Sequence, residues 1–193
     1  PVVRASTIIF KTMDELRKTQ KRSKKDPIGG HFDYGRQGTS TTFILQKMLK
    51  EMEECHHVFL TPTGFGSVFL SIFSVVRPGD EILVADPVYY PTRLLTEDFL
   101  KSFNIKTIFY DSRNLNTLKS KITKKTKLIY VENPGSNSFE FQDLSKIVSL
   151  AKKHKLFTAI DNTWATPYFL KPIKLGFDMS IVSATKYYSG HSD

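Results

Sequence analysis

The sequence predicts an α/β fold in which a mostly parallel sheet is flanked by helices. Two observations support this prediction. Short segments rich in β-branched and aromatic residues alternate with segments of helical periodicity, and no internal repeat or low-complexity linker interrupts the alternation. The chain has 193 residues, of which 40% are hydrophobic, enough for one domain with a substantial core.

Residues 1–40 contain few regular patterns, and we expect an N-terminal segment with one short helix near residues 13–21. In the loop that follows, Tyr34 and Arg36 lie among glycines and hydroxyl residues. They could bind a phosphate or a carboxylate, or the loop could be a turn with an exposed arginine. A helix is predicted from about Thr41 to His56, because apolar residues recur there at helical spacing and would pack inward. These residues are Ile44, Leu45, Met48, Leu49, Met52 and Cys55.

Residues 41–193 are predicted to form the α/β domain. A short buried strand at 58–60 leads through a glycine-containing turn into a helix at 68–76, which is apolar nearly all round and therefore expected to be buried. The glycine loop that opens this helix contains Gly64 and Phe65. Their free backbone N–H groups and the positive end of the helix dipole could bind a phosphate, although glycines before helices are common. The further strands are predicted at 81–85, 105–110, 127–132 and 156–160, with a last apolar run at 179–182.

Charge and cysteine content restrict the class of protein. The net charge of +9 comes from lysines scattered over predicted turns and polar helix faces, so we expect no nucleic-acid site. No apolar run is long enough to span a bilayer, and the chain opens without a signal-peptide pattern. Cys55 is the only cysteine, so no internal disulfide can form and a cytoplasmic location is expected. No cluster of His, Cys and carboxylate residues has metal-ligand spacing, so no metal is expected.

Residues with functional polar groups, on the side chain or on the backbone, follow the predicted strands or the turns beside them. They are Gly64, Tyr89, Glu132, Asp161 and Lys186. Taken alone, any of them could be an ordinary loop residue, and Lys186 could be one surface lysine among many. In a parallel sheet, however, the carboxyl ends of the strands share one edge, so these five loops should converge on a single crevice.

The residues at this edge together suit pyridoxal 5′-phosphate. An acid at Asp161 could hold a protonated pyridine nitrogen, Tyr89 could stack on the ring, and Lys186 could form a Schiff base with the aldehyde and later move the Cα proton. Four residues could hold the phosphate: Gly64, Phe65, Ser183 and Thr185.

With these residues, the chain resembles the cysteine/methionine-metabolism family of pyridoxal-phosphate enzymes, which has the aspartate-aminotransferase fold (fold type I). The matching motifs are Tyr34-Gly-Arg36, Thr63-Gly-Phe65, Asp86-Pro-Val-Tyr89, Asp161-Asn-Thr163, Ser183-Ala-Thr-Lys-Tyr187 and Gly190-His-Ser-Asp193. The resemblance implies that Lys186 is the Schiff-base lysine, Asp161 the pyridinium partner and Tyr89 the stacking ring. It also implies that Tyr34 and Arg36 reach the cofactor of a neighbouring subunit, in a homodimer or homotetramer.

Within the family, two stretches look most like the cystathionine β-lyase branch. They are Glu132-Asn-Pro-Gly-Ser-Asn-Ser-Phe-Glu140 and Asp161-Asn-Thr-Trp-Ala-Thr-Pro167. The implied reaction is β-elimination, which converts cystathionine to homocysteine, pyruvate and ammonia. Other members of the family remain alternatives: a cystathionine γ-synthase, a γ-lyase or an O-acetylhomoserine sulfhydrylase.

The chain stops seven residues after Lys186, whereas related enzymes continue into a smaller C-terminal domain that supplies an arginine for the substrate carboxylate. We therefore expect a fragment or a truncated gene product with little lyase activity of its own. An inactive chain that only binds the cofactor or a partner is a further alternative.

Overall fold

The structure is a computed structural model that describes residues 2–191. Contacts within the chain divide it into two units, Pro1–Leu60 and Thr61–Asp193, and each is described by itself. The predicted division into an N-terminal segment of 1–40 and a domain of 41–193, with the first segment reaching a partner subunit, stays a prediction.

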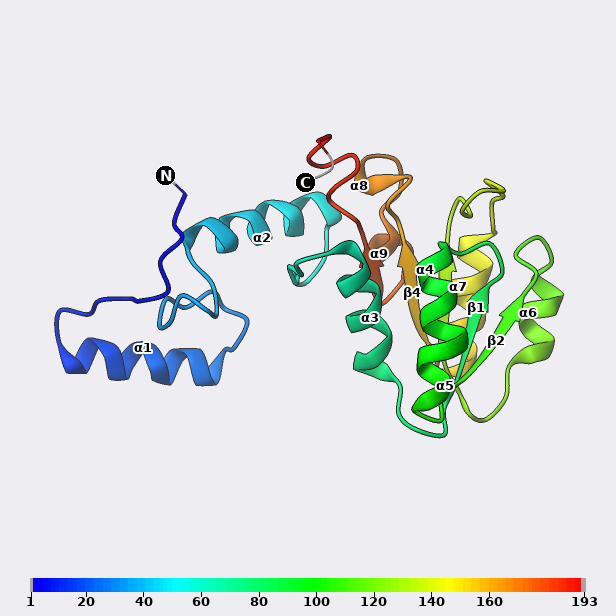
Figure 1. The fold of residues 1–193 in the computed structure, drawn as a ribbon, viewed down its shortest axis with the longest axis horizontal. Coiled ribbons are helices and arrows are strands. Elements are labelled where there is room, and N and C mark those ends of the chain that lie inside the picture. Colours follow the sequence, from blue (N-terminus) through cyan, green and yellow to red (C-terminus); the bar gives the residue numbers. More distant parts are fainter. Residues whose placement is uncertain (1, 192–193) are drawn as a thin grey trace. The chain divides into compact units, whose positions relative to one another are not determined.

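The first unit contains two helices, α1 (Met13–Lys25) and α2 (Ser40–Glu53) (Figure 1). Helix α1 runs four residues beyond the predicted end. Acidic residues in its first turn and basic residues in its last turn complement the helix dipole, and the side chain of Thr12 caps its start. A reciprocal capping box between Thr39 and Thr42 opens α2.

Two predictions for the first unit are wrong. The apolar side chains of α2 were expected to be buried, but Glu53 is the only buried residue of that helix, and Ile44 and Met48 are 60% and 57% exposed. Residues 58–60 form no strand, and Phe59 is 64% exposed. Periodicity identifies an apolar face without saying what covers it, and three apolar residues do not make a strand where no neighbouring strand pairs with them.

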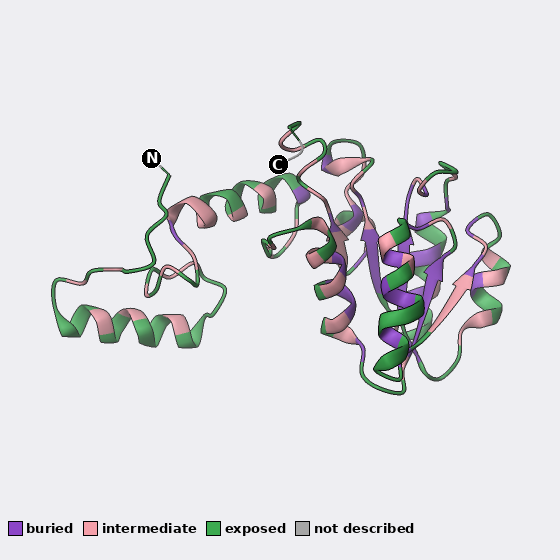
Figure 2. Ribbon diagram, viewed as in Figure 1, coloured by how far each residue is buried: buried purple, intermediate pink, exposed green. Residues whose placement is uncertain are grey.

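The second unit is built on five parallel strands, as predicted for an α/β fold. The strands are β1 (Glu81–Ala85), β2 (Lys106–Tyr110), β3 (Thr126–Glu132), β4 (Phe157–Asp161) and β5 (Met179–Ile181), in the order β2-β1-β3-β4-β5. The three middle strands are mostly buried, which is expected where helices cover both faces of a parallel sheet (Figure 2).

The helical elements of this unit precede the first strand or connect the strands. They are α3 (Gly64–Val75), α4 (Tyr90–Leu94), the π-helical turn η1 (Leu95–Phe99), α5 (Leu100–Ser102), α6 (Leu115–Lys121), α7 (Leu144–His154), α8 (Thr166–Phe169) and α9 (Pro172–Leu175). Helix α3 contacts α4, and α7 contacts α9. Because crossovers between parallel strands are right-handed, the segment from α4 to α5 and the helices α6 and α7 lie on opposite faces of the sheet. Helix α3 is not buried all round as expected, since Leu70 is 46% exposed.

Candidate active site

The candidate site lies at the carboxyl edge of the sheet. All five strands run in the same direction, so their C-terminal ends share this edge. Glu132 ends β3, Asp161 ends β4, and the two residues are direct neighbours in the strand register. The edge therefore brings two carboxyl groups together on adjacent strands.

Lys186 lies in a cluster of hydroxyl groups that follows β5. Its Nζ donates a hydrogen bond of 3.2 Å to Ser183 Oγ, which is 3.0 Å from Thr185 Oγ1. The backbone N–H of Ser183 donates to Thr163 Oγ1 at 2.9 Å, which ties the cluster to the loop after β4. The structure thus places an amine and two hydroxyl groups together, as the sequence predicted.

The start of α3 comes close to the same cluster. A Cβ atom added to Gly64 would lie 2.6 Å from Ser183 Oγ, which is closer than any side chain tolerates, so a glycine is needed here. The first N–H groups of a helix, here those of Gly64 and Phe65, have no acceptor within the helix and carry its positive dipole end. Beside the hydroxyls of Ser183 and Thr185, they can form a cradle for a phosphate.

Asp161 is held in place by its own loop. The backbone N–H of Thr163 donates to Asp161 Oδ1 at 3.0 Å. Burial raises the pKa of Asp161, and the hydrogen bonds from Thr163 and the charge of Lys186 act against that rise. A carboxylate in this environment can bind a cationic ring nitrogen.

Tyr89 follows β1 and is joined to β3 by Glu132. The N–H of Tyr89 donates to Glu132 Oε2 at 2.6 Å, while the side chain of Tyr89 remains 45% exposed and free to stack on a planar ligand. The pKa of Glu132 is raised to about 7, chiefly by burial and in part by the nearby charge of Asp161, while hydrogen bonds from Ser136 and Tyr89 act against the rise. Sequence reasoning placed Glu132 at this edge but gave it no role.

Tyr34 and Arg36 belong to the first unit. The guanidinium of Arg36 lies 5.4 Å from the centre of the Tyr34 ring, and both side chains are exposed. Within the first unit both side chains are thus available for binding, and their role toward the cofactor of a partner subunit stays a prediction. In the last predicted motif, Ser192 and Asp193 lie outside the described residues.

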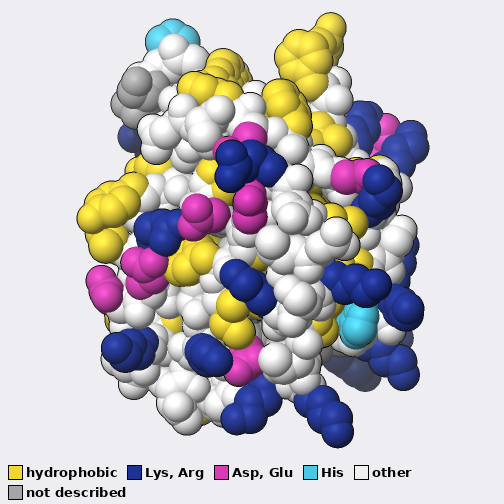
Figure 3. Space-filling view, turned by 90° about the vertical axis from the view of Figure 1, so that its right-hand side faces the viewer, with side chains coloured by type: hydrophobic (Ala, Val, Ile, Leu, Met, Phe, Trp, Pro, Cys, Tyr) yellow, Lys and Arg dark blue, Asp and Glu magenta, His cyan; other side chains and the backbone are white. Residues whose placement is uncertain are grey.

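Other classes of site receive no support from the part of the chain that the structure describes. Residues 2–191 contain no group of three or more His, Cys, Asp and Glu residues that could hold a metal ion. None of the described helices has the length and apolar character that crossing a membrane requires. Figure 3 shows basic side chains dispersed among acidic and apolar ones on one face, without the continuous basic stripe typical of a nucleic-acid site. An apolar hollow of about 680 Å³ borders Phe65, but neither Asp161 nor Lys186 lines it.

The residues at the sheet edge fit pyridoxal 5′-phosphate. The close approach of Gly64 to Ser183 joins helix N–H groups and hydroxyls in one cradle, suited to a phosphate. Asp161 offers a carboxylate for a ring nitrogen, and Lys186 offers a primary amine for an aldehyde.

Comparison with known proteins points the same way. The profile of the family described as Cys/Met metabolism PLP-dependent enzymes matches residues 1–193. A cystathionine beta-lyase of Bordetella avium is 35% identical over 193 residues, which are 100% of this chain and 48% of that protein. An L-alanine/L-glutamate racemase of Wolbachia pipientis wMel is also 35% identical, over 100% of this chain and 49% of that protein.

A solved structure is also similar. It is a protein of Campylobacter jejuni subsp. jejuni NCTC 11168, provisionally named an O-acetylhomoserine (thiol)-lyase, with N′-pyridoxyl-lysine-5′-monophosphate in its chain. It has a TM-score of 0.89 and 27% identity, over 100% of this chain and 46% of that one. The chain thus spans about half the length of the relatives it matches.

Proposed function

The chain belongs to the Cys/Met metabolism family of pyridoxal-phosphate-dependent enzymes, and on this premise we propose that it acts in carbon–sulfur bond cleavage of the cystathionine β-lyase type. The observation that supports the proposal most is the cluster of Lys186, Ser183, Thr185 and Gly64 beside Asp161 at one edge of the sheet. Pyridoxal 5′-phosphate supplies, when bound, an aldehyde that condenses with amines and a ring that withdraws electrons from the substrate Cα.

Each residue of the cluster has a proposed task. The N–H groups of Gly64 and Phe65 and the hydroxyls of Ser183 and Thr185 bind the phosphate. Asp161 holds the ring nitrogen and keeps its proton in place, and Tyr89 covers the ring. The charge of this carboxylate sustains the electron-withdrawing character of the ring.

Lys186 is the proposed catalytic base. With the cofactor bound, its amine would hold the aldehyde between turnovers, and as a free amine Nζ would take the Cα proton of the substrate. The hydrogen bond from Nζ to Ser183 Oγ holds the amine at the side of the phosphate cradle. In the proposed reaction, cystathionine and water give homocysteine, pyruvate and ammonia.

The β-lyase assignment rests on likeness to one branch of the family. The Bordetella avium relative has that name, but the Wolbachia relative is a racemase at the same identity, so a different reaction of the same family is the second candidate. Purified protein supplied with cystathionine, methionine or O-acetylhomoserine distinguishes the candidates. Because the chain is expected to have little lyase activity of its own, we expect only slow release of pyruvate from cystathionine, whereas 2-oxobutyrate from methionine would favour a γ-lyase.

The assignment of Lys186 has a direct chemical test. Reduction of the cofactor-loaded protein with sodium borohydride, followed by peptide mapping, should place the pyridoxyl group on Lys186. A pyridoxyl group on any other lysine would overturn the proposed site, whatever substrate the protein uses.

A further inference from the structure

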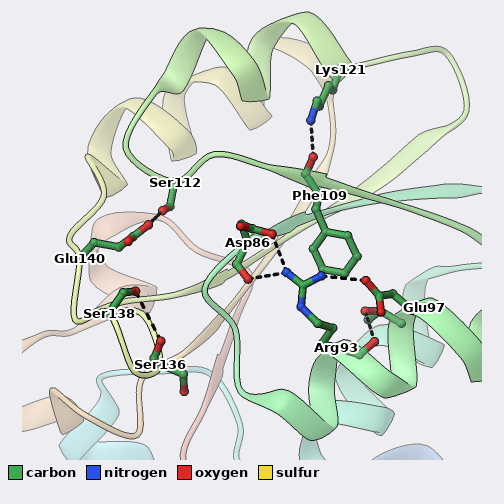
Figure 4. Close-up of polar contacts among 10 residues, drawn as sticks. Asp86, Arg93, Glu97, Phe109, Ser112, Lys121, Ser136, Ser138 and Glu140 are labelled. Carbon is green, nitrogen blue, oxygen red and sulfur yellow. Dashed lines mark hydrogen bonds and ion pairs between the residues drawn. The ribbon is translucent and has the colours of Figure 1, made fainter.

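The loop that carries Tyr89 is fixed at its start by an arginine. Arg93 Nη2 donates to the backbone oxygen of Asp86 at 2.8 Å and to its Oδ1 at 2.5 Å, and Arg93 Nη1 donates to Glu97 Oε1 at 2.7 Å. The guanidinium lies 4.0 Å from the centre of the Phe109 ring (Figure 4). The first residue of the loop is therefore held by charge and by stacking.

The other end of the loop is fixed by Glu132. This residue is only 4% exposed, yet each of its carboxyl oxygens accepts a hydrogen bond. One comes from the N–H of Tyr89 and the other from the hydroxyl of Ser136, both at 2.6 Å. A buried side chain thus joins the loop after β1 to the loop after β3.

The two loops are also interlocked through their backbones. The N–H of Ser136 donates to the backbone oxygen of Pro87 at 2.7 Å. A Cβ atom added to Gly135 would lie 2.6 Å from Pro87 Cγ, so the loops approach too closely for a larger residue. Held in this way, the Tyr89 backbone sets the position from which the ring projects.

We propose that Glu132 is a positioning residue, which fixes the ring of Tyr89 over the cofactor through the hydrogen bond from the Tyr89 N–H rather than through its negative charge. The inference rests on the proposed cofactor site. It assigns Glu132 a task that acts through Tyr89 and does not require contact with the cofactor. An unpaired buried N–H would be costly, so loss of the acceptor should displace the Tyr89 backbone.

Two conservative substitutions at position 132 separate the effect of side-chain length from the effect of its negative charge. Glu132→Gln keeps an acceptor oxygen at the same reach for the Tyr89 N–H and removes the charge, and its amide can donate to Ser136 Oγ. Glu132→Asp keeps the charge but is one methylene shorter. The matched control is Glu140→Gln, because Glu140 lies on the same loop and also accepts a hydrogen bond from a serine, Ser112, but has no bond to the Tyr89 loop (Figure 4).

The experiment measures the dissociation constant for pyridoxal 5′-phosphate by absorbance titration. We expect Glu132→Gln and Glu140→Gln to bind within about threefold of the parent, and Glu132→Asp to bind about tenfold or more weakly. In a Tyr89→Ala background, Glu132→Asp should add less than threefold, because its effect passes through Tyr89. Circular dichroism melting shows that each variant is folded under the conditions used.

Contrary results are distinguishable. If Glu132→Gln binds weakly while Glu132→Asp binds like the parent, charge is the operative property and the inference is wrong. If the losses from Glu132→Asp and Tyr89→Ala multiply in the double variant, Glu132 does not act through Tyr89. If the parent itself binds no cofactor at Lys186, the proposed function fails instead.

Discussion

Replacing Glu132 by Gln is expected to remove a pH-dependent loss of stability. Burial raises the pKa of Glu132 from its ordinary value of 4.5 to about 7 in the folded chain. Below pH 4.5 the carboxyl is protonated in both the folded and the unfolded chain, so it has no effect on the balance between them. Between pH 4.5 and 7 the unfolded chain releases the proton and the folded chain retains it, so stability falls as the pH rises.

The magnitude follows from the pKa difference. One pKa unit corresponds to about 1.4 kcal/mol, so the rise from 4.5 to about 7 gives a loss of about 3 kcal/mol in the free energy of unfolding once the pH exceeds 7. Asp161 on β4 and the phenol of Tyr130 on β3 are the other titratable groups that interact electrostatically with Glu132. Burial also raises the pKa of Asp161, so part of the parent's pH dependence remains in the Gln variant.

Urea unfolding of the cofactor-free protein at pH 5 and pH 8 tests this prediction. The free energy of unfolding of the parent should fall by about 2.5 kcal/mol more than that of Glu132→Gln between these limits, because part of the loss has already occurred at pH 5. Glu140→Gln should follow the parent. Equal pH dependence in the parent and Glu132→Gln would show that the carboxyl titrates normally and that the reasoning from its burial is wrong.

Three further predictions concern the cofactor. Lys186→Ala should lack the visible absorption of the lysine-bound cofactor, and an unchanged spectrum would exclude this lysine. Gly64→Ala should weaken cofactor binding by about tenfold or more and destabilise the fold by about 1–3 kcal/mol, since the new methyl would meet Ser183; binding and urea unfolding within error of the parent would contradict this. Arg36→Ala should weaken cofactor binding by about tenfold to a hundredfold. If Arg36 acts across a subunit interface, mixing this variant with Lys186→Ala subunits should restore a fraction of the sites. No recovery in verified hybrids would place the contact within one chain.

Local patterns were sufficient for much of the sheet. The strand predicted at residues 81–85 agrees with β1 to the residue, because turn residues bound it and its apolar character is clear. The helix expected near residues 13–21 extends to Lys25, because the basic residues of its last turn interact favourably with the helix dipole and stabilise its C-terminal end.

The segment at residues 58–60 and the apolar face of α2 show where local patterns fail. Both are apolar, and both were expected to be buried, but burial depends on a neighbour that no local pattern specifies. The same limit applies to Tyr34 and Arg36. Their residue types indicate what they could bind, and nothing in the neighbouring sequence indicates which chain supplies it.

The location of the site at the edge of the sheet could be predicted from the sequence, but the contacts between its residues could not. Once the strands are known to be parallel, their carboxyl ends must share an edge, so Asp161 and Lys186 could be brought together from the order of elements alone. The hydrogen bond from Tyr89 to Glu132 joins residues 43 positions apart and depends on the lengths of two loops. Sequence patterns give the residue types at the edge, whereas the task of Glu132 follows only from the direction in which its carboxyl points. The comparison of Gln and Asp at this position therefore tests the part of the site that the sequence could not reveal.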